Sequence, residues 1–164
     1  MKRIVFFLLA VCLLVGVTSG AASAKTLYLY ATEPWSNGNN SAWEDALSAN
    51  VKITQTNGQC MELRFSTEAG TAGTDTSPQI AFRALVNGVL ARPAFRDAGL
   101  LDGAVFFDPS EFGQYDIASF NWFVCGLNIG VHTVQIQFLP VYANTATVRA
   151  GMIAIEFKSG KFAP

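Results

Sequence analysis

Alternation of apolar and polar side chains at every second residue is the feature that most constrains the fold of this chain. Met61, Leu63 and Phe65 lie on one side of an extended segment, and the residues between them lie on the other. The same period recurs around residues 27–31, 51–54, 80–87, 120–125, 132–138 and 145–157. Because a period of two is that of a half-buried β-strand, and no long helical period is present, the sequence predicts an all-β protein.

Turn signals separate these segments and indicate the architecture. Asn57-Gly58 and Asn87-Gly88 are two-residue hairpin signals, and clusters of Gly, Asn, Pro and Ser lie between the other segments. About eight strands with one apolar face each are typical of two antiparallel sheets that bury only their inner surfaces. We therefore expect an antiparallel β-sandwich, in particular a jelly roll. Residues 41–48 are locally compatible with a single helical turn.

The N-terminus has the layout of a secretory signal peptide. Lys2 and Arg3 form a short basic opening, residues 4–17 are an uncharged apolar run, and Ala22-Ser23-Ala24 is an A-x-A cleavage site. The run is shorter than the roughly 20 residues that a membrane-spanning helix needs. A retained anchor is one alternative. A lipoprotein is another, but the bulky residue before Cys12 makes a poor lipidation site. We expect residues 1–24 to be removed, leaving one β-sandwich domain over residues 25–164, secreted to the periplasm or the extracellular space.

Net charge argues against a nucleic-acid partner. Removal of residues 1–24 leaves nine basic and twelve acidic side chains, a net charge of −3 with histidine neutral. Nucleic-acid binding requires a concentrated basic surface, which this lightly acidic chain lacks. No later segment approaches membrane-spanning length. The partners that remain open are an extracellular protein, a second copy of this chain in a homo-oligomer, and a glycan.

Two cysteines remain after the signal peptide is removed. Cys60 and Cys125 would be exported to a compartment in which disulfides persist, and two free thiols are the alternative. Both residues fall on the outward side of their strands in the alternation. Since bonded cysteines have Cα atoms only about 5.5–6 Å apart, the strand of Cys60 is expected to lie beside the strand of Cys125.

No catalytic or metal-binding constellation is evident. His132 is the only histidine, and its position on the inward side of an alternating strand favours a residue that closes the end of the core. Zinc usually needs several His or Cys ligands, so we expect no metal and no cofactor. Solvated loop residues are the simplest interpretation of the acids that could otherwise bind calcium or act in a glycosidase, namely Asp97, Asp102, Asp108, Glu111 and Asp116.

Aromatic residues in the N-terminal third are the most suggestive candidates for a binding site. Tyr28 and Tyr30 share the face opposite the apolar one, and Trp35 and Trp43 follow in a segment rich in asparagine. Exposed rings beside polar groups can stack on sugar rings. The alternative is that Trp43 covers the core and that the tyrosines merely cover a sheet surface. Trp122 alternates with apolar residues and is expected in the core.

Strand and turn motifs follow one another along the chain in the order Leu63-Arg64-Phe65-Ser66, Phe82-Arg83-Ala84-Leu85-Val86-Asn87-Gly88-Val89, Phe120-Asn121-Trp122, Gly130-Val131-His132-Thr133-Val134-Gln135-Ile136-Gln137 and Ala146-Thr147-Val148-Arg149. This order resembles secreted bacterial β-sandwich modules of unassigned function, and jelly rolls of the C1q and tumour-necrosis-factor type. The resemblance implies this fold and a non-catalytic role, but it transfers no functional residue. By analogy with C1q-type trimers, Phe106, Phe107 and Phe123 would supply an aromatic interface.

Three functions follow from these observations. The first is a non-catalytic extracellular module that binds a partner or assembles with itself. The second is a carbohydrate-binding module that uses Tyr28, Tyr30, Trp35 or Trp43. The third is a secreted hydrolase or lyase that uses His132 or the loop acids. A patch formed by outward Leu85, Phe123 and Val131 would favour an interface, because large exposed apolar patches mark interaction sites.

Overall fold

A computed structural model describes most of the chain after the predicted signal peptide. The described residues are 26–31, 34–38, 41–54, 59–72, 78–93, 101–109, 113–141, 143 and 145–159. The predicted signal peptide (residues 1–24) and the Asn57-Gly58 turn lie outside them. No helix among the described residues is long and apolar enough to cross a membrane.

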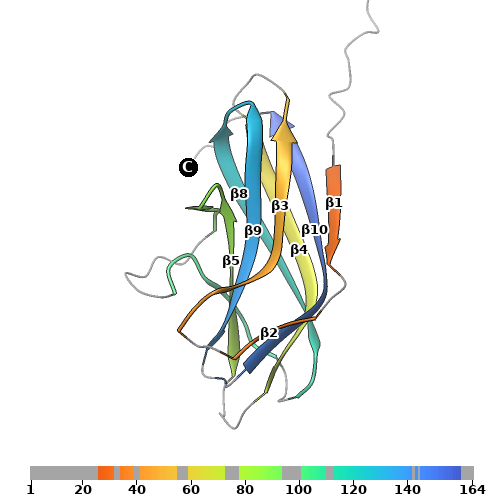
Figure 1. The fold of residues 1–164 in the computed structure, drawn as a ribbon, viewed down its shortest axis with the longest axis vertical. Coiled ribbons are helices and arrows are strands. Elements are labelled where there is room, and N and C mark those ends of the chain that lie inside the picture. The colour runs from red at the N-terminus through yellow and green to blue at the C-terminus, as the bar shows by residue number, and fades with distance from the viewer. Residues whose placement is uncertain are drawn as a thin grey trace, which may run out of the picture.

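Ten antiparallel strands make up the described part of the chain. The two sheets face each other, and the strands run roughly along the long axis of the molecule (Figure 1). The strands are β1 (Thr26–Ala31), β2 (Trp35–Asn37), β3 (Glu44–Ile53), β4 (Gln59–Ala72), β5 (Gln79–Val86), β6 (Val89–Leu90), β7 (Val105–Phe107), β8 (Asp116–Leu127), β9 (Gly130–Val141) and β10 (Thr145–Ser159).

The strand order is that of a jelly roll. Sheet A has the order β1-β10-β4-β8, with β2 also paired to β10, and sheet B has the order β3-β9-β5-β6, with β7 also paired to β5. Each sheet therefore interleaves strands from both ends of the chain, which is the pattern of two Greek keys. The predicted antiparallel β-sandwich is confirmed, and the short strands β2, β6 and β7 raise the number above the expected eight.

The predicted helical turn at residues 41–48 is wrong. Glu44 begins β3, which pairs with β9 from Glu44↔Phe138 to Ile53↔Gly130. The register shifts between Asp45 and Leu47, so this stretch contains a β-bulge. Tertiary pairing with β9 and burial of Ala46 and Leu47 outweigh a local helix propensity that is small per residue.

The core contains the residues that the alternation placed inward. Five large fully buried side chains illustrate this from both sheets: Leu63, Phe65, Trp122, Ile136 and Phe138. A second small cluster lies on the outer side of sheet B, where Leu139 and Ala81 are covered by Ala104. Burial of one large apolar side chain contributes roughly 1.5–3 kcal/mol, so the interior between the sheets dominates the stability.

The predicted disulfide is present and joins neighbouring strands of sheet A. Cys60 in β4 is bonded to Cys125 in β8, with Cα atoms 4.0 Å apart. The two strands pair directly, as the cysteine positions predicted. The expectation that both residues face outward is only partly right, because Cys125 is exposed whereas Cys60 is only 1% exposed. The register of β4 against β8 shifts between Gln59 and Met61, around Cys60, and such a bulge changes the direction of a side chain.

The Asn87-Gly88 turn connects β5 to β6 as predicted. Both residues have positive φ, 54° and 77°, as a two-residue hairpin turn requires. The Asn87 side chain also holds β9: its Nδ2 donates to His132 Nδ1 at 2.8 Å, and its Oδ1 accepts from the Thr133 backbone N–H at 2.9 Å. His132 Nε2 lies 2.8 Å from the Asn128 carbonyl oxygen and must donate to it. The buried imidazole is therefore the neutral tautomer with hydrogen on Nε2.

Replacement of Asn87 by alanine is expected to lower the free energy of unfolding by about 2 kcal/mol. The change leaves His132 Nδ1 without its hydrogen-bond donor and places alanine at a positive φ. Asn87→Gly keeps the backbone freedom and removes only the side-chain hydrogen bonds, so it should cost about 1 kcal/mol. Urea unfolding followed by tryptophan fluorescence measures both values. Equal costs for the two variants would contradict the contribution of backbone conformation.

Candidate functional site

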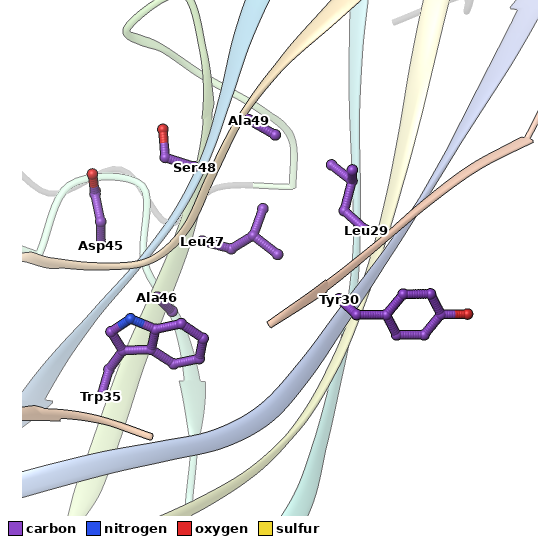
Figure 2. A pocket seen from close by; sticks show the side chains of 8 residues that line it. All are labelled: Leu29, Tyr30, Trp35, Asp45, Ala46, Leu47, Ser48 and Ala49. Carbon is purple, nitrogen blue, oxygen red and sulfur yellow. The ribbon is translucent and has the colours of Figure 1, made fainter. Parts of the chain in front are cut away.

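A cleft opens between the two sheets on the side where both end in an edge strand. β1 is the last strand of sheet A and β3 the last strand of sheet B. The cleft between them has a volume of about 380 Å³, within the usual range for small-ligand sites. It is lined by Leu29, Tyr30, Trp35, Asp45, Ala46, Leu47, Ser48 and Ala49 (Figure 2).

The side chains that point into this cleft are apolar. Leu29 and Leu47 come from opposite sheets and point into the space between the strands, with Trp35 next to Ala46 (Figure 2). The ring of Tyr30 leaves β1 on the other side from Leu29, as successive residues of a strand do (Figure 2). Tyr30 thus stands where the cleft meets the outer face of sheet A.

Strand β2 closes one end of the cleft and ties the two sheets together. Trp35 pairs with Val148 of β10 in sheet A. Two residues later, buried Asn37 donates from Nδ2 to the Ala42 carbonyl at 2.9 Å and to the Phe138 carbonyl of β9 at 3.4 Å. This crossing contact fixes Trp35 as a half-buried wall of the cleft.

The outer face of sheet A carries the two most exposed aromatic rings of the described chain. Tyr28 is 54% exposed and Tyr30 is 70% exposed. They are two residues apart on β1, so their Cα atoms are about 7 Å apart on the same face. Rings this exposed contribute little to the core, and a rigid amphipathic side chain with two rotatable angles is well suited to binding.

Cross-strand pairing places polar groups beside these tyrosines. One row runs Tyr28, Ala154, Arg64 and Asn121 across β1, β10, β4 and β8. The neighbouring row runs from Tyr30 through Met152 to Ser66 and Ser119, whose hydroxyls lie 3.0 Å apart. We call these eight residues the tyrosine face.

Two carboxylates hold the guanidinium of Arg64. Its Nε donates to Glu62 Oε1 at 2.9 Å, and its Nη2 lies 3.4 Å from a carboxylate oxygen of Glu156. The hydrogen bond to Glu62 and the charges of Glu62 and Glu156 raise the pKa of Arg64, and Tyr28 is close enough to contribute. The guanidinium is therefore permanently charged and held in place by the two carboxylates.

Trp43 lies away from the other three aromatic candidates. It packs on the small outer cluster of sheet B, and the guanidinium carbon of Arg83 lies 4.2 Å from the centre of its ring. Arg83 donates from Nε to Gln137 Oε1 at 2.8 Å, and Gln137 in turn donates to Asp45. Burial lowers the pKa of Arg83, and the negative charges of Asp102 and Asp45 offset part of this effect by raising it. Trp43 thus packs over the small apolar cluster on the outer side of sheet B.

Among the described residues considered for catalysis, His132 and Asp116 lie far apart. His132 is buried near the connection that crosses from β8 to β9, and its ring nitrogens are engaged by Asn87 and Asn128. Asp116 begins β8 and so lies at the far end of a strand of about 12 residues, roughly 35 Å away. Asp97 and Glu111 lie outside the described residues. Among the residues that are described, no group of three or more His, Cys, Asp or Glu side chains could hold a metal ion.

Sequence reasoning identified the tyrosines but missed their polar neighbours Glu62, Arg64 and Asn121. The available signal was the alternation itself, which places Glu62, Arg64 and Ser66 on the outward side of the strand whose inward side is Met61, Leu63 and Phe65. The alternation did not indicate that β10 separates this strand from the one bearing the tyrosines.

Comparison with known proteins shows the fold alone. No protein-family model matches the chain, and no curated protein matches it. Among solved structures, it is similar to the VP2 subviral particle of infectious bursal disease virus, with a TM-score of 0.53, 11% identity and coverage of 86% of this chain. The Gx strain of the same virus gives a TM-score of 0.54, 10% identity and 87% coverage. The chain spans about a third of the length of these capsid chains, 34%.

A sugar-binding protein is also among the similar structures. The C-terminal domain of EclA, described as a sugar-binding protein, has 11% identity over 80% of this chain and 79% of its own, with a TM-score of 0.38. That score is too low to carry an argument about function. The capsid structures, above 0.5, support the β-sandwich that the strand order already shows.

Proposed function

We propose that this chain is a non-catalytic, exported binding module that recognises carbohydrate through the tyrosine face. The exposure of Tyr28 and Tyr30 beside the anchored guanidinium of Arg64 carries the proposal. The faces of aromatic rings are electron-rich, so they attract the weakly positive C–H groups on the flat side of a sugar ring. Guanidinium, amide and hydroxyl groups alongside the rings supply hydrogen bonds to sugar hydroxyls.

The cleft supports the same proposal from the other side of β1. Tyr30 lies at its rim and Trp35 within it, so together with Tyr28 on the same strand as Tyr30, three aromatic side chains lie at one edge of the sandwich. The apolar lining by Leu29 and Leu47 suits a methyl or acyl substituent of a bound sugar. Export through a signal peptide over residues 1–24 remains part of the proposal, and the Cys60–Cys125 disulfide is compatible with it.

Self-assembly is the second candidate, suggested by capsid structures of the same fold. The residues proposed for an interface come from both sheets. Phe106 and Phe107 lie on β7 in sheet B, whereas Phe123 lies on β8 in sheet A. Val131 belongs to sheet B, where it pairs with Lys52.

Replacement of both tyrosines, Tyr28→Ala with Tyr30→Ala, is expected to weaken polysaccharide binding at least tenfold, which corresponds to about 1.4 kcal/mol. The reason is the loss of two exposed rings that make no core contacts. Affinity electrophoresis in gels that contain soluble polysaccharides measures the change, and the double variant to phenylalanine should retain most of the binding.

Val131→Ala is the matched control, because Val131 is 63% exposed on the opposite sheet. It should bind as the unmodified protein does, and light scattering on the same samples should report a monomer. Failure of every glycan to bind, or equal binding by the double alanine variant, would overturn the proposed function.

A further inference from the structure

The cleft between β1 and β3 has apolar walls from both sheets. Leu29 of β1, Trp35 of β2 and Ala49 of β3 line it and are only partly buried. Its volume of about 380 Å³ is more than twice the roughly 150 Å³ of an apolar cavity that holds benzene. On that scale the cleft has room for a hydrocarbon group of about ten carbons or more.

A β-bulge explains why the sheet B wall of the cleft is apolar. The register of β3 against β9 shifts between Asp45 and Leu47, and the successive residues Ala46 and Leu47 are both buried. In a regular strand, one of two successive side chains would point to the outer face. The bulge places both on the inner side, where Leu47 points into the cleft opposite Leu29 (Figure 2).

The acidic side chain of the lining is held on the outer face of sheet B. Asp45 Oδ1 accepts from Gln137 Nε2 at 2.7 Å, and its Oδ2 accepts from Gln135 Nε2 at 3.2 Å. Both glutamines belong to β9, and both hydrogen bonds are exposed. The eight described lining residues include no cationic side chain. An anionic group in the cleft would therefore find no counter-charge, so hydrocarbon is the part of a ligand that these walls fit.

Tyr30 connects the cleft to the tyrosine face. It lines the cleft, yet its ring is 70% exposed and leaves β1 on the other side from Leu29 (Figure 2). Successive residues of a strand are about 3.4 Å apart, so a ligand that contacts Leu29 can continue onto the ring of Tyr30. The apolar cleft and the ring proposed to stack on sugars are therefore continuous. Such a surface fits a ligand that is hydrocarbon at one end and sugar at the other.

We infer that this chain binds glycolipids, with the alkyl or acyl chain in the cleft and the sugar head group on the ring of Tyr30. The inference rests on the proposed function and adds the ligand class. Leu29, Trp35 and Leu47 contact the hydrocarbon chain and exclude water from it, and Tyr30 stacks on the first sugar. Affinity therefore increases with the length of the hydrocarbon chain, which polysaccharide binding alone does not predict.

Alkyl glycosides separate the contributions of the two parts of the ligand. The probes are methyl, hexyl and octyl β-glucoside, octyl β-galactoside and 1-octanol, each titrated below the concentration at which micelles form and followed by isothermal titration calorimetry. Octyl glucoside should bind at least tenfold more tightly than methyl glucoside, since each methylene group removed from water adds to the affinity. At least one octyl glycoside should bind at least threefold more tightly than 1-octanol, because only the glycosides place a sugar on Tyr30.

Two results of this series would overturn the inference. Equal affinity for methyl and octyl glucoside would show that the cleft takes no hydrocarbon. Equal affinity for 1-octanol and both octyl glycosides would show that the ligand is not a glycolipid. Retardation by soluble polysaccharides in affinity electrophoresis, measured on the same protein, tests the proposed function separately, so the two failures are distinguishable.

Ala49→Phe tests the location of the hydrocarbon chain, because it places a ring in the cleft. It should weaken binding of octyl glucoside at least fivefold and change polysaccharide retardation less than twofold. Val131→Phe is the matched control, since it adds a ring at a position that is 63% exposed on the same sheet. Equal effects of the two variants would overturn the cleft as the site. A dimer that Ala49→Phe dissociates would also overturn it, because a second copy would then occupy the cleft.

Tyr30→Ala keeps the test decisive if Ala49→Phe does not fold, because Tyr30 is exposed and its loss leaves the core unchanged. This variant should lose the advantage of the octyl glycosides over 1-octanol, with binding of 1-octanol itself changed less than twofold. An unchanged advantage would overturn the placement of the sugar head group on Tyr30.

Discussion

Reduction of the Cys60–Cys125 disulfide is expected to lower the free energy of unfolding by about 4 kcal/mol. The bond joins residues 65 apart in sequence, and the chain-entropy relation gives about 4 kcal/mol for a loop of this length. The loop includes β5, β6 and β7 in addition to most of β4 and β8. Reduction therefore increases the conformational freedom of this long segment in the unfolded chain. Guanidinium chloride titrations with and without reductant measure the difference.

The double variant Cys60→Ala with Cys125→Ala is the control for effects of the reductant. It should match the reduced protein within about 1 kcal/mol, since both lack the same constraint on the unfolded state. If the reduced protein and the variant are both as stable as the oxidised protein, the disulfide does not stabilise this fold.

Replacement of Phe82 by alanine is expected to lower the free energy of unfolding by about 3–5 kcal/mol. Phe82 is fully buried on β5, and its ring contacts rings from both sheets. The centroid distances are 4.9 Å to Phe120, 6.1 Å to Phe65 and 6.4 Å to Phe138. Neighbours on two facing sheets cannot all move into the space, so the cavity term adds to the lost transfer free energy.

Phe82→Leu separates ring contacts from volume. Leucine fills most of the space, so this variant should cost less than half as much as alanine. Thermal unfolding followed by far-ultraviolet circular dichroism ranks the variants, with exposed Val131→Ala expected within about 0.5 kcal/mol of the unmodified protein. An alanine variant no worse than the leucine variant would show that Phe82 is not central to the core.

The sequence alone predicted which side of four long strands, β4, β5, β8 and β9, is buried. Phe65, Phe82, Trp122 and Phe138 from their inward sets are among the largest buried side chains, and Phe120 and Val124 of β8 pack partly buried against the core. The prediction succeeds because successive side chains of a strand point to opposite faces, so the face depends only on whether a position is odd or even along the strand. The same reasoning predicted that the strands of Cys60 and Cys125 are neighbours, because a disulfide requires the two Cα atoms to be close together.

The sequence could not predict the local exception or the composition of the site. Residues 41–48 are locally suitable for a helix but belong to β3, because pairing with β9 decides their conformation. Cys60 is buried because a bulge interrupts the alternation of side chains that would have placed it outward. Trp43 was grouped with Tyr28, Tyr30 and Trp35, although it lies on the outer side of the other sheet.

Periodicity and turn residues determined that this chain forms a β-sandwich and that Tyr28 and Tyr30 share an outward face, since both follow from neighbours in sequence. Only the tertiary structure decided that Arg64 and Glu156, 92 residues apart, meet beside those tyrosines. Strand order in a sheet depends on pairings between distant segments, whose stability comes from the whole core rather than from either segment. For that reason the sequence identified the aromatic residues of the proposed site, while the assembled sheet supplied its charge and its neighbours.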